Sequence, residues 1–290
     1  MHNVIAKSIL SNNNGINIYR GCTHGCIYCD SRSLCYGMSH AFEDIEVKIN
    51  APELLENALK RKRKKCVIGT GAMSDPYIHL EEQLQYTRKC IEIIDKYNFG
   101  FAVLTKSTRI LRDLDLLKNI NEKSTCIVQT TLTTYDEELC KVLEPNVSST
   151  KERVEMLKIM RDNSIPTVVW LGPFLPYIND DGENLRGILN YCIEAKVKGI
   201  LVFGIGVTMR DGNREYFYKN LDKSFKGMKE KYIHKYGYSY EVGSDNHSKF
   251  MKIIKETCER HNIIFGVEEI FEYLKTYEDK KQNVQMSFNI

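Results

Sequence analysis

The sequence predicts an α/β fold with a parallel sheet and helices packed outside it. Roughly six strand patterns alternate with helix patterns over residues 16–205, which is typical of a parallel sheet. Hydrophobic residues make up 42% and charged residues 27% of the 290 residues, values that favour a packed globular core over a disordered or fibrous chain. A parallel sheet of this size either stays open or closes into a barrel.

The first strand and helix flank a loop that is dense in cysteine. Residues 16–20 have apolar side chains at alternate positions and lead into the loop between Cys22 and Cys35. Asn50 supplies an N-cap, with proline in the first turn and Glu53 three residues on, so we expect a helix from there to about residue 65. Residues 66–69 form the next short, apolar strand pattern.

The alternation continues to residue 205. Helix starts are indicated by Thr134 with Glu137 and by a capping box of Ser149 with Glu152. The further strands are expected over residues 101–105, 125–132, 167–171 and 199–203. The helices between them carry apolar residues at helical spacing: Leu84, Ile91 and Ile94; Ile110, Leu114 and Leu117; Val154, Leu157 and Met160; and a helix over about residues 183–195.

The last third of the chain has a different pattern. From residue 206 it becomes helical, aromatic and basic, with helices expected near residues 245–261 and 267–277. No linker and no repeat of fixed period separates it from the rest. We therefore expect one domain over residues 1–290, with a core over about 16–205 and a C-terminal helical cover over about 206–290.

Composition excludes several classes of protein. The longest nearly uncharged stretch, residues 165–179, is too short for a membrane span and contains three prolines. The first 19 residues lack a secretory signal, so we expect a cytoplasmic location, where most of the ten cysteines should be reduced thiols or metal ligands. A net charge of +3 neither requires nor excludes nucleic acid as a partner.

Three cysteines within eight residues are the strongest chemical signal. Cys22, Cys26 and Cys29 give the spacing Cys-x3-Cys-x2-Cys, and a cubane iron–sulfur cluster held by three cysteines leaves one iron open to bind another molecule. Gly21 and Gly25 allow a short loop to wrap around a cluster. The alternative is a tetrahedral zinc site whose fourth ligand is Cys35, His24 or His40.

This spacing, with Tyr28 just before the last cysteine, resembles the signature of the radical SAM superfamily. The resemblance implies a partial (β/α)6 TIM-like barrel and a [4Fe-4S] cluster held by Cys22, Cys26 and Cys29. The open iron would chelate S-adenosylmethionine, an electron would cleave it to a 5′-deoxyadenosyl radical, and this radical would take hydrogen from the substrate. Tyr28 would contact the adenine. An electron donor such as flavodoxin or ferredoxin is implied as a partner.

A narrower resemblance covers most of the chain. The segments 29–33, 69–77, 105–107, 144–145 and 173–176 resemble the spore-photoproduct-lyase-like group, and most of all its members called radical SAM mobile pair protein B, which are encoded beside a second radical SAM protein. By the group's pattern, four further residues would contact S-adenosylmethionine: Lys106 its carboxylate, Thr131 its ribose, and Gly71 and Gly172 its surface. Ala72 departs from the pattern, because the lyases carry a hydrogen-donating cysteine there.

The substrate is less well indicated. The group resemblance and the basic, aromatic cover favour a nucleic acid or nucleotide, since aromatic rings stack on bases and cations bind phosphates. The first alternative is a peptide or protein modified together with a paired radical SAM partner, and another is a zinc-stabilised nucleic-acid-binding module without catalysis. The basic run over residues 60–65 ends the first helix, so we expect it on the face opposite the active site.

Overall fold

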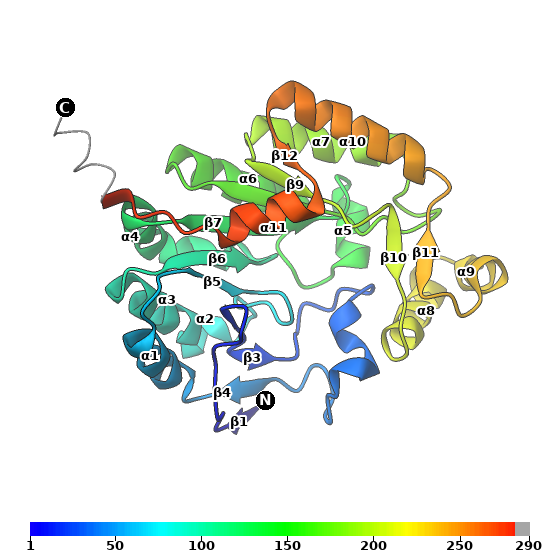
Figure 1. Ribbon diagram of the computed structural model, residues 1–290. Coiled ribbons are helices and arrows are strands. Elements are labelled where there is room, and N and C mark those ends of the chain that lie inside the picture. Colours follow the sequence, from blue (N-terminus) through cyan, green and yellow to red (C-terminus); the bar gives the residue numbers. More distant parts are fainter. Residues whose placement is uncertain (282–290) are drawn as a thin grey trace.

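The computed structural model describes residues 1–281 and has a seven-stranded parallel sheet at its centre (Figure 1). Every neighbouring pair in this sheet is parallel, and its two edge strands do not pair with each other, so the sheet forms a partial barrel. In spatial order the strands are β12 (Ile264–Phe265), β9 (Gly199–Leu201), β8 (Thr167–Leu171), β7 (Cys126–Leu132), β6 (Gly100–Leu104), β5 (Val67–Thr70) and β2 (Gly15–Ile16).

Helices cover the outer face of the sheet. Outward residues of the strands, such as Val103 in β6 and Val128 in β7, are fully buried against apolar helix faces, for which Ile91 and Leu157 are examples. This burial on both faces explains why the strands read as apolar runs. The outer helices are α1 (Ala51–Arg61), α2 (Glu81–Leu84), α3 (Tyr86–Lys96), α4 (Leu114–Lys123), α5 (Glu137–Leu143), α6 (Thr150–Asp162), α7 (Gly182–Glu194) and α10 (His247–His261).

The inner face of the sheet is closed at one end by α11 (Val267–Lys275). Ile270 and Leu274 of this helix pack against inward residues of five strands, and Figure 1 shows α11 lying across the sheet. We call this apolar cluster the interior plug; its buried members are Val67, Ala102, Ile127, Val168, Leu201, Ile270 and Leu274. The plug fills the end of the barrel at which the strands begin and leaves the other end free.

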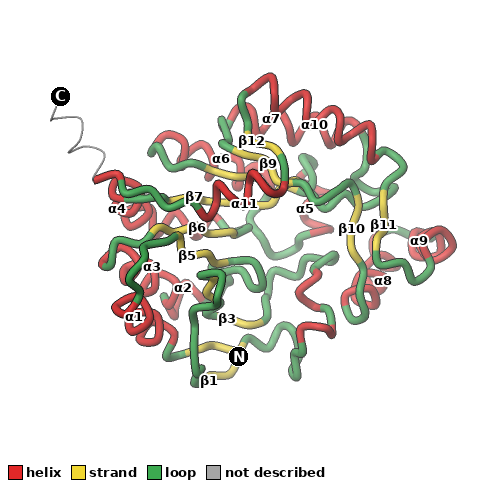
Figure 2. The backbone as a smooth tube through the Cα atoms, in the orientation of Figure 1, coloured by secondary structure: helices red, strands yellow, loops and turns green. Residues whose placement is uncertain are grey.

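Two smaller units flank the other end of the barrel. A three-stranded sheet joins β1 (His2–Val4), β4 (Glu46–Lys48) and β3 (Tyr19–Arg20). The cover contains an antiparallel pair, β10 (Gly206–Thr208) and β11 (Glu241–Gly243), together with α8 (Asn213–Ser224) and α9 (Met228–Tyr236). Figure 2 shows loops gathered between these units and the strand ends. Within residues 1–281, every helix is too short or too polar to cross a membrane.

The cover packs directly on the cysteine loop. Phe217 and Tyr232 are buried in one cluster with Cys26 and Tyr28, so these cover aromatics serve packing. Tyr238, by contrast, is 89% exposed and Tyr240 is 45% exposed. The aromatic residues of the cover thus fall into a buried set that packs on the cysteine loop and an exposed set at the surface.

Several expected boundaries are wrong. Residues 16–20 do not form one strand, because β2 joins the large sheet and β3 the small one. The first helix ends at Arg61, ahead of the basic run's end, and Asn50 makes no cap bond because its side chain bonds the backbone of Ala6. Asp136 caps α5 in place of Thr134. The Ser149 capping box is confirmed.

The expected end of the core at residue 205 is also too early. β12 adds a seventh strand beside β9, and α11 completes the interior plug, so the last third of the chain contributes to the barrel as well as to the cover. The helix expected around Leu84 and Ile91 is interrupted at Gln85, which has φ +53° and separates α2 from α3.

Candidate active site

A cavity of about 600 Å³ lies at the carboxyl ends of the parallel strands. The residues after β5, β6 and β8 and the end of β7 face it, as do the cysteine loop and the cover. It is lined by all eight residues that the sequence singled out: Cys22, Cys26, Tyr28, Cys29, Gly71, Lys106, Thr131 and Gly172. The structure thus brings these residues together, although they are spread over 150 positions of the chain.

Backbone hydrogen bonds hold the cysteine loop on two sides. The Cys22 N–H donates to the Phe42 carbonyl at 3.1 Å, and the Ile27 N–H donates to the Leu143 carbonyl at 3.0 Å. Gly21 has φ +92°, and a Cβ there would lie 2.4 Å from the Phe42 oxygen, so only glycine allows this close approach. The expected role of Gly21 in shaping the loop is therefore consistent with its conformation.

The three cysteines fit an iron–sulfur cluster better than a single ion. Burial raises the pKa of the Cys22 thiol to about 12 and that of Cys26 well above its ordinary value, so thiolates here need a bound metal to stabilise them. Around one zinc ion, sulfur atoms would lie about 3.8 Å apart. Among residues 1–281, the three sulfur atoms do not form a trio with all separations below 4.8 Å, a spread that suits a larger cluster.

The candidates for a fourth zinc ligand are dispersed. Cys35 is exposed, does not line the cavity, and has its sulfur 3.7 Å from Arg210 Nη1. His40 meets the ring of His2 edge to face beside the small sheet, with the ring centres 4.7 Å apart. His24 does line the cavity, and its Nδ1 lies 3.5 Å from Asp75 Oδ2, while its buried Nε2 has no hydrogen-bond partner within residues 1–281. A buried nitrogen without a partner, beside Cys22 and Cys26, is expected where a bound group would supply that partner.

Asp75 organises two of the loops that form the cavity. Its Oδ1 accepts hydrogen bonds from the Tyr77 N–H at 2.8 Å and the Thr105 hydroxyl at 2.7 Å, and its Oδ2 accepts from the Lys106 N–H at 2.8 Å. The loop after β5 is thereby fixed to the loop after β6. Since Oδ2 also faces His24, this carboxylate connects both loops to the cysteine loop.

A buried charged network holds Tyr28. The Tyr28 hydroxyl donates to Glu144 and lies 3.0 Å from the Thr133 hydroxyl, while Glu144 is paired with Arg153, whose side chain is fully buried. Arg153 Nη1 also donates to the Thr131 carbonyl at 2.7 Å. Burial alone would raise the pKa of Glu144, but the charges of Arg153 and Lys106 and the hydrogen bonds from Arg153 and Tyr28 together outweigh it, so the net shift of this pKa is downward. The network fixes the ring of Tyr28 against the cavity.

Lys106 supplies the cavity with a positive charge. Its ammonium group lies 5.8 Å from the centre of the Tyr28 ring and, within residues 1–281, makes no hydrogen bond or ion pair. Burial lowers the pKa of Lys106, whereas the negative charges at Cys26 and Glu144 raise it by more in total. The net shift of the pKa is upward, and the group stays protonated at neutral pH. A free ammonium group of this kind can bind a carboxylate.

The outer part of the cavity has an aromatic wall. Trp170 and Phe203, at the ends of β8 and β9, meet edge to face with their centres 5.6 Å apart, and Phe203 is 67% exposed. The Trp170 Nε1–H donates to Gln129 at 2.9 Å, which fixes the indole. Across the cavity, Tyr240 of the cover accepts a hydrogen bond from Arg210, which also pairs with Asp30 next to Cys29.

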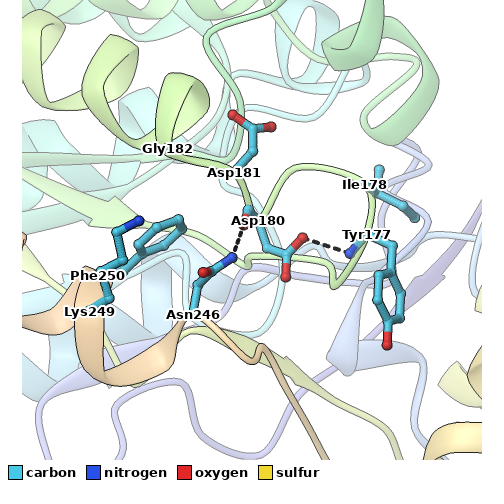
Figure 3. Close-up of a pocket in the computed structure, with 8 residues that line it drawn as sticks. All are labelled: Tyr177, Ile178, Asp180, Asp181, Gly182, Asn246, Lys249 and Phe250. Atoms are coloured by element: carbon cyan, nitrogen blue, oxygen red, sulfur yellow. Dashed lines mark hydrogen bonds between the residues drawn. The ribbon is translucent and has the colours of Figure 1, made fainter.

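A second hollow of about 450 Å³ lies between the start of α7 and the start of α10 (Figure 3). Its carboxylates are already engaged: Asp180 accepts from the Tyr177 N–H and the Ser244 hydroxyl, and Asp181 caps α7. None of the predicted site residues lines it. It therefore has no part in the chemistry of the cysteine loop.

Three supporting residues, Asp75, Glu144 and Arg153, were not assigned these roles from the sequence. Arg153 did carry a signal, because it lies on the same face of α6 as Leu157 and Met160, where a charge must find a buried partner. Asp75 and Glu144 carry no such signal, since their partners come from other parts of the chain.

Comparison with known proteins identifies relatives in archaea, bacteria and viruses. An uncharacterized protein of Methanocaldococcus jannaschii is 33% identical over 167 residues, which cover 57% of this chain and 61% of the relative. An uncharacterized protein of Mycobacterium tuberculosis is 28% identical over 210 residues, or 70% of this chain and 61% of the relative. The matches thus span about three fifths of these relatives' length. An uncharacterized protein of Acidianus two-tailed virus is 25% identical over 234 residues, 76% of each chain.

Solved structures of spore photoproduct lyase share the fold. The lyase complexed with a dinucleoside spore photoproduct aligns with a TM-score of 0.62 and 16% identity, covering 89% of this chain and 77% of the lyase. A variant of the lyase with bound AdoMet aligns with a TM-score of 0.58 and 16% identity, covering 84% and 71%. The family model of the radical SAM superfamily matches residues 16–189, which include the cysteine loop and strands β2 to β8. The chain belongs to the radical SAM superfamily, whose enzymes use a [4Fe-4S] cluster and S-adenosylmethionine.

Proposed function

We propose that this radical SAM enzyme acts on a nucleic acid or nucleotide. When bound, the [4Fe-4S] cluster and S-adenosylmethionine supply a 5′-deoxyadenosyl radical that removes a hydrogen atom from the substrate. The observation that carries the substrate proposal is the aromatic wall of the cavity, where Trp170 and the largely exposed Phe203 offer ring surfaces beside the predicted cofactor residues. Every base has a flat face that stacks on such rings.

The cofactor roles assigned to the inner cavity are part of this proposal. Cys22, Cys26 and Cys29 hold the cluster, and Lys106 binds the carboxylate of S-adenosylmethionine with its free ammonium group. Tyr28, fixed by Glu144, lies against the adenine. Thr131 contacts the ribose, and Gly71 and Gly172 lie along the cofactor.

Gly71 illustrates why these positions suit a cofactor. It has φ +101°, and a Cβ there would lie 1.9 Å from the Leu104 carbonyl oxygen. The backbone after β5 therefore runs unusually close to the next strand, and this leaves the cavity floor free of side-chain bulk. A cofactor can lie directly on the backbone at this point.

Charges around the aromatic wall support the same substrate class. Arg210 lies at the cavity's edge, where it bonds Tyr240, and among residues 1–281 its one ion pair is with Asp30. A guanidinium next to exposed aromatic rings matches the phosphate and base of a nucleotide. The fold neighbour that binds a dinucleoside photoproduct adds support, although the reaction here must differ in its hydrogen donor.

The difference lies at Ala72. This residue lines the cavity where the lyase-like pattern has a cysteine, and Cys66, at the other end of β5, does not reach the cavity. Among residues 1–281, the cavity contains no thiol besides the three cysteines of the loop. We infer a reaction whose product radical is not quenched by a protein thiol.

Radical SAM enzymes need a reductant, and we propose flavodoxin or ferredoxin in a reducing cytoplasm as the source of the electron. The function is tested with anaerobically reconstituted protein, dithionite and S-adenosylmethionine, measuring 5′-deoxyadenosine with DNA, RNA, nucleotides or peptides added. The Cys26→Ala variant is the control for cluster-dependent cleavage. We expect nucleic acid or nucleotide to stimulate product formation more than peptide does.

The aromatic wall is tested by a matched pair of variants. Phe203→Ala should lose most of the stimulation by nucleic acid, because it removes the exposed ring at the cavity mouth. Tyr238→Ala removes a ring that is even more exposed but does not line the cavity, and should keep the stimulation. Stimulation by peptide alone, or only with a second radical SAM protein present, would replace this proposal with the peptide-modifying alternative.

A further inference from the structure

A second group of metal-ligating side chains lies away from the cysteine loop. His2, His40 and Asp44 each offer one ligand atom, and these atoms all lie within 4.8 Å of one another. His2 begins β1, whereas His40 and Asp44 come from the segment that leads into β4, so the three residues join two parts of the chain that are paired in the small sheet. Their side chains are partly exposed, which leaves an entry path for an ion.

The hydrogen bond of His40 leaves its other ring nitrogen, Nε2, able to bind a cation. Its Nδ1 lies 3.0 Å from the Ala41 carbonyl oxygen, and because a carbonyl can only accept, Nδ1 must carry the proton. In the neutral ring Nε2 is then a lone-pair acceptor. This Nε2 is buried without a hydrogen-bond partner within residues 1–281. Glu46 Oε2 lies 3.8 Å from it, a contact that becomes an ion pair only when the ring is protonated.

This arrangement is the one found in metal-binding histidines. A histidine ligand usually donates its second ring N–H to a backbone carbonyl or carboxylate, which orients the ring and directs the other nitrogen at the metal. His40 does this through Ala41. His2 Nδ1 lies 3.0 Å from Asp44 Oδ2, a pair of ligand atoms that an ion could bridge in place of a proton. Ligand atoms around a tetrahedral zinc ion lie about 3.3 Å apart, which is below the 4.8 Å that bounds the separations of this trio.

We propose that His2, His40 and Asp44 bind a divalent transition-metal ion of the zinc type. Imidazole nitrogens with one carboxylate suit zinc better than magnesium or calcium, which prefer all-oxygen sites. The other oxygen of Asp44 lies 3.0 Å from the amino group of Met1, so it has a partner of its own. Water fills the remaining coordination position.

The ion would stabilise the support of the cysteine loop. Phe42 lies between His40 and Asp44 in the sequence, its carbonyl accepts the Cys22 N–H, and its ring lines the cavity. Arg32, from the turn after the cysteines, also places its guanidinium 4.3 Å from the centre of this ring. An ion that fixes residues 40–44 to β1 therefore also fixes the Phe42 carbonyl, which accepts the hydrogen bond from Cys22.

The test uses the holoenzyme with its cluster in place, so that the three cysteines are not available to added metal. Zinc is added, and bound zinc and iron are measured after removal of free metal. We expect one zinc per chain with no loss of iron, and a higher melting temperature in the presence of zinc. His40→Gln and Asp44→Asn should each weaken zinc binding by at least about tenfold.

A matched histidine variant separates this site from general surface binding. His261→Gln, at the exposed end of α10, should bind zinc as the unaltered protein does. Melting temperatures without zinc, measured for each variant, show that the variants fold. Zinc bound at the expense of iron, zinc binding equal in all variants, or no stoichiometric binding would each overturn the proposal, while leaving the assay of 5′-deoxyadenosine unaffected.

Discussion

The two ends of the barrel interior are built from the same strands and do opposite things. In β7, Ile127 lies in the interior plug, while Thr131, four residues later, lines the cavity. Along β8 the same change runs from Val168 to Gly172, the residue directly after the strand. One end is filled by α11 and is apolar, whereas the other holds the cavity, where the cysteine loop and Lys106 face aromatic and apolar side chains. Position along a strand, and not choice of strand, therefore separates stability from chemistry in this protein.

The buried network at Arg153 should be an exception to this separation, because it contributes both to stability and to the position of cavity residues. Arg153→Met leaves Glu144 as an unpaired buried carboxylate, and we expect a loss of about 3–5 kcal/mol in the free energy of unfolding. The double variant with Glu144→Leu removes both charges and should recover most of that loss. Urea unfolding measures both. A double variant as unstable as the single one would show that the cost is not electrostatic.

The interior plug should affect stability alone. Ile270→Ala removes a fully buried side chain from the plug, and we expect a loss of about 2–4 kcal/mol in the free energy of unfolding. Ile233→Ala, on the 46% exposed side chain of α9, is the control and should change little. Affinity for S-adenosylmethionine should be unchanged in the folded plug variant. A large loss of affinity would mean that the two ends are coupled.

Lys106 should affect the cofactor alone. Lys106→Met keeps the length of the side chain but removes the charge, and we expect S-adenosylmethionine to bind about 10- to 100-fold more weakly, the loss of one charge-assisted hydrogen bond. Iron content and melting temperature should change little, because within residues 1–281 the ammonium group makes no hydrogen bond or ion pair. Equilibrium dialysis of the cluster-loaded protein measures the affinity. Undiminished binding would remove Lys106 from the cofactor site.

The smallest effect is expected in the outer helices, which belong to neither end. Hydrogen bonds from Lys96 and Tyr97 lower the pKa of Glu56 to about 2, and they link α1 to α3. The pKa is lower in the folded chain, so this contribution is present above about pH 4.5 and is lost as the pH falls toward 2. Glu56→Gln should flatten the pH dependence of stability in this window only, as acid titration of the melting temperature will show.

Much of the fold could be predicted from the sequence, because buried parallel strands are apolar throughout and their helices carry start signals. The five strands expected between residues 66 and 203 agree with β5 to β9 to within two residues at each end. The missed seventh strand, β12, has only two residues, Ile264 and Phe265, which are too few to show a period. The same limit applies to β2 and β3, whose short segments merge into one alternating pattern.

The candidate site divides in a similar way. Cysteine spacing is local, so Cys22, Cys26 and Cys29 could be identified directly, and resemblance located Lys106 and Thr131 at strand ends. The supporting contacts are not local. Tyr28 and Glu144 are 116 residues apart, and Asp75 and Thr105 are 30 apart. No pattern along the chain records such pairs, since they form only when neighbouring strand ends meet.

The position of α11 in the chain has a consequence during synthesis. During translation, β5 to β9 are synthesised before α11. Their inner apolar residues therefore lack their packing partner until residues 267–275 have been synthesised. The incomplete barrel is therefore an aggregation-prone intermediate until α11 has been synthesised and packs against it. A premature stop between β9 and α11 would release a chain with most of its sheet formed and its interior exposed, which is a substrate for chaperones or for aggregation.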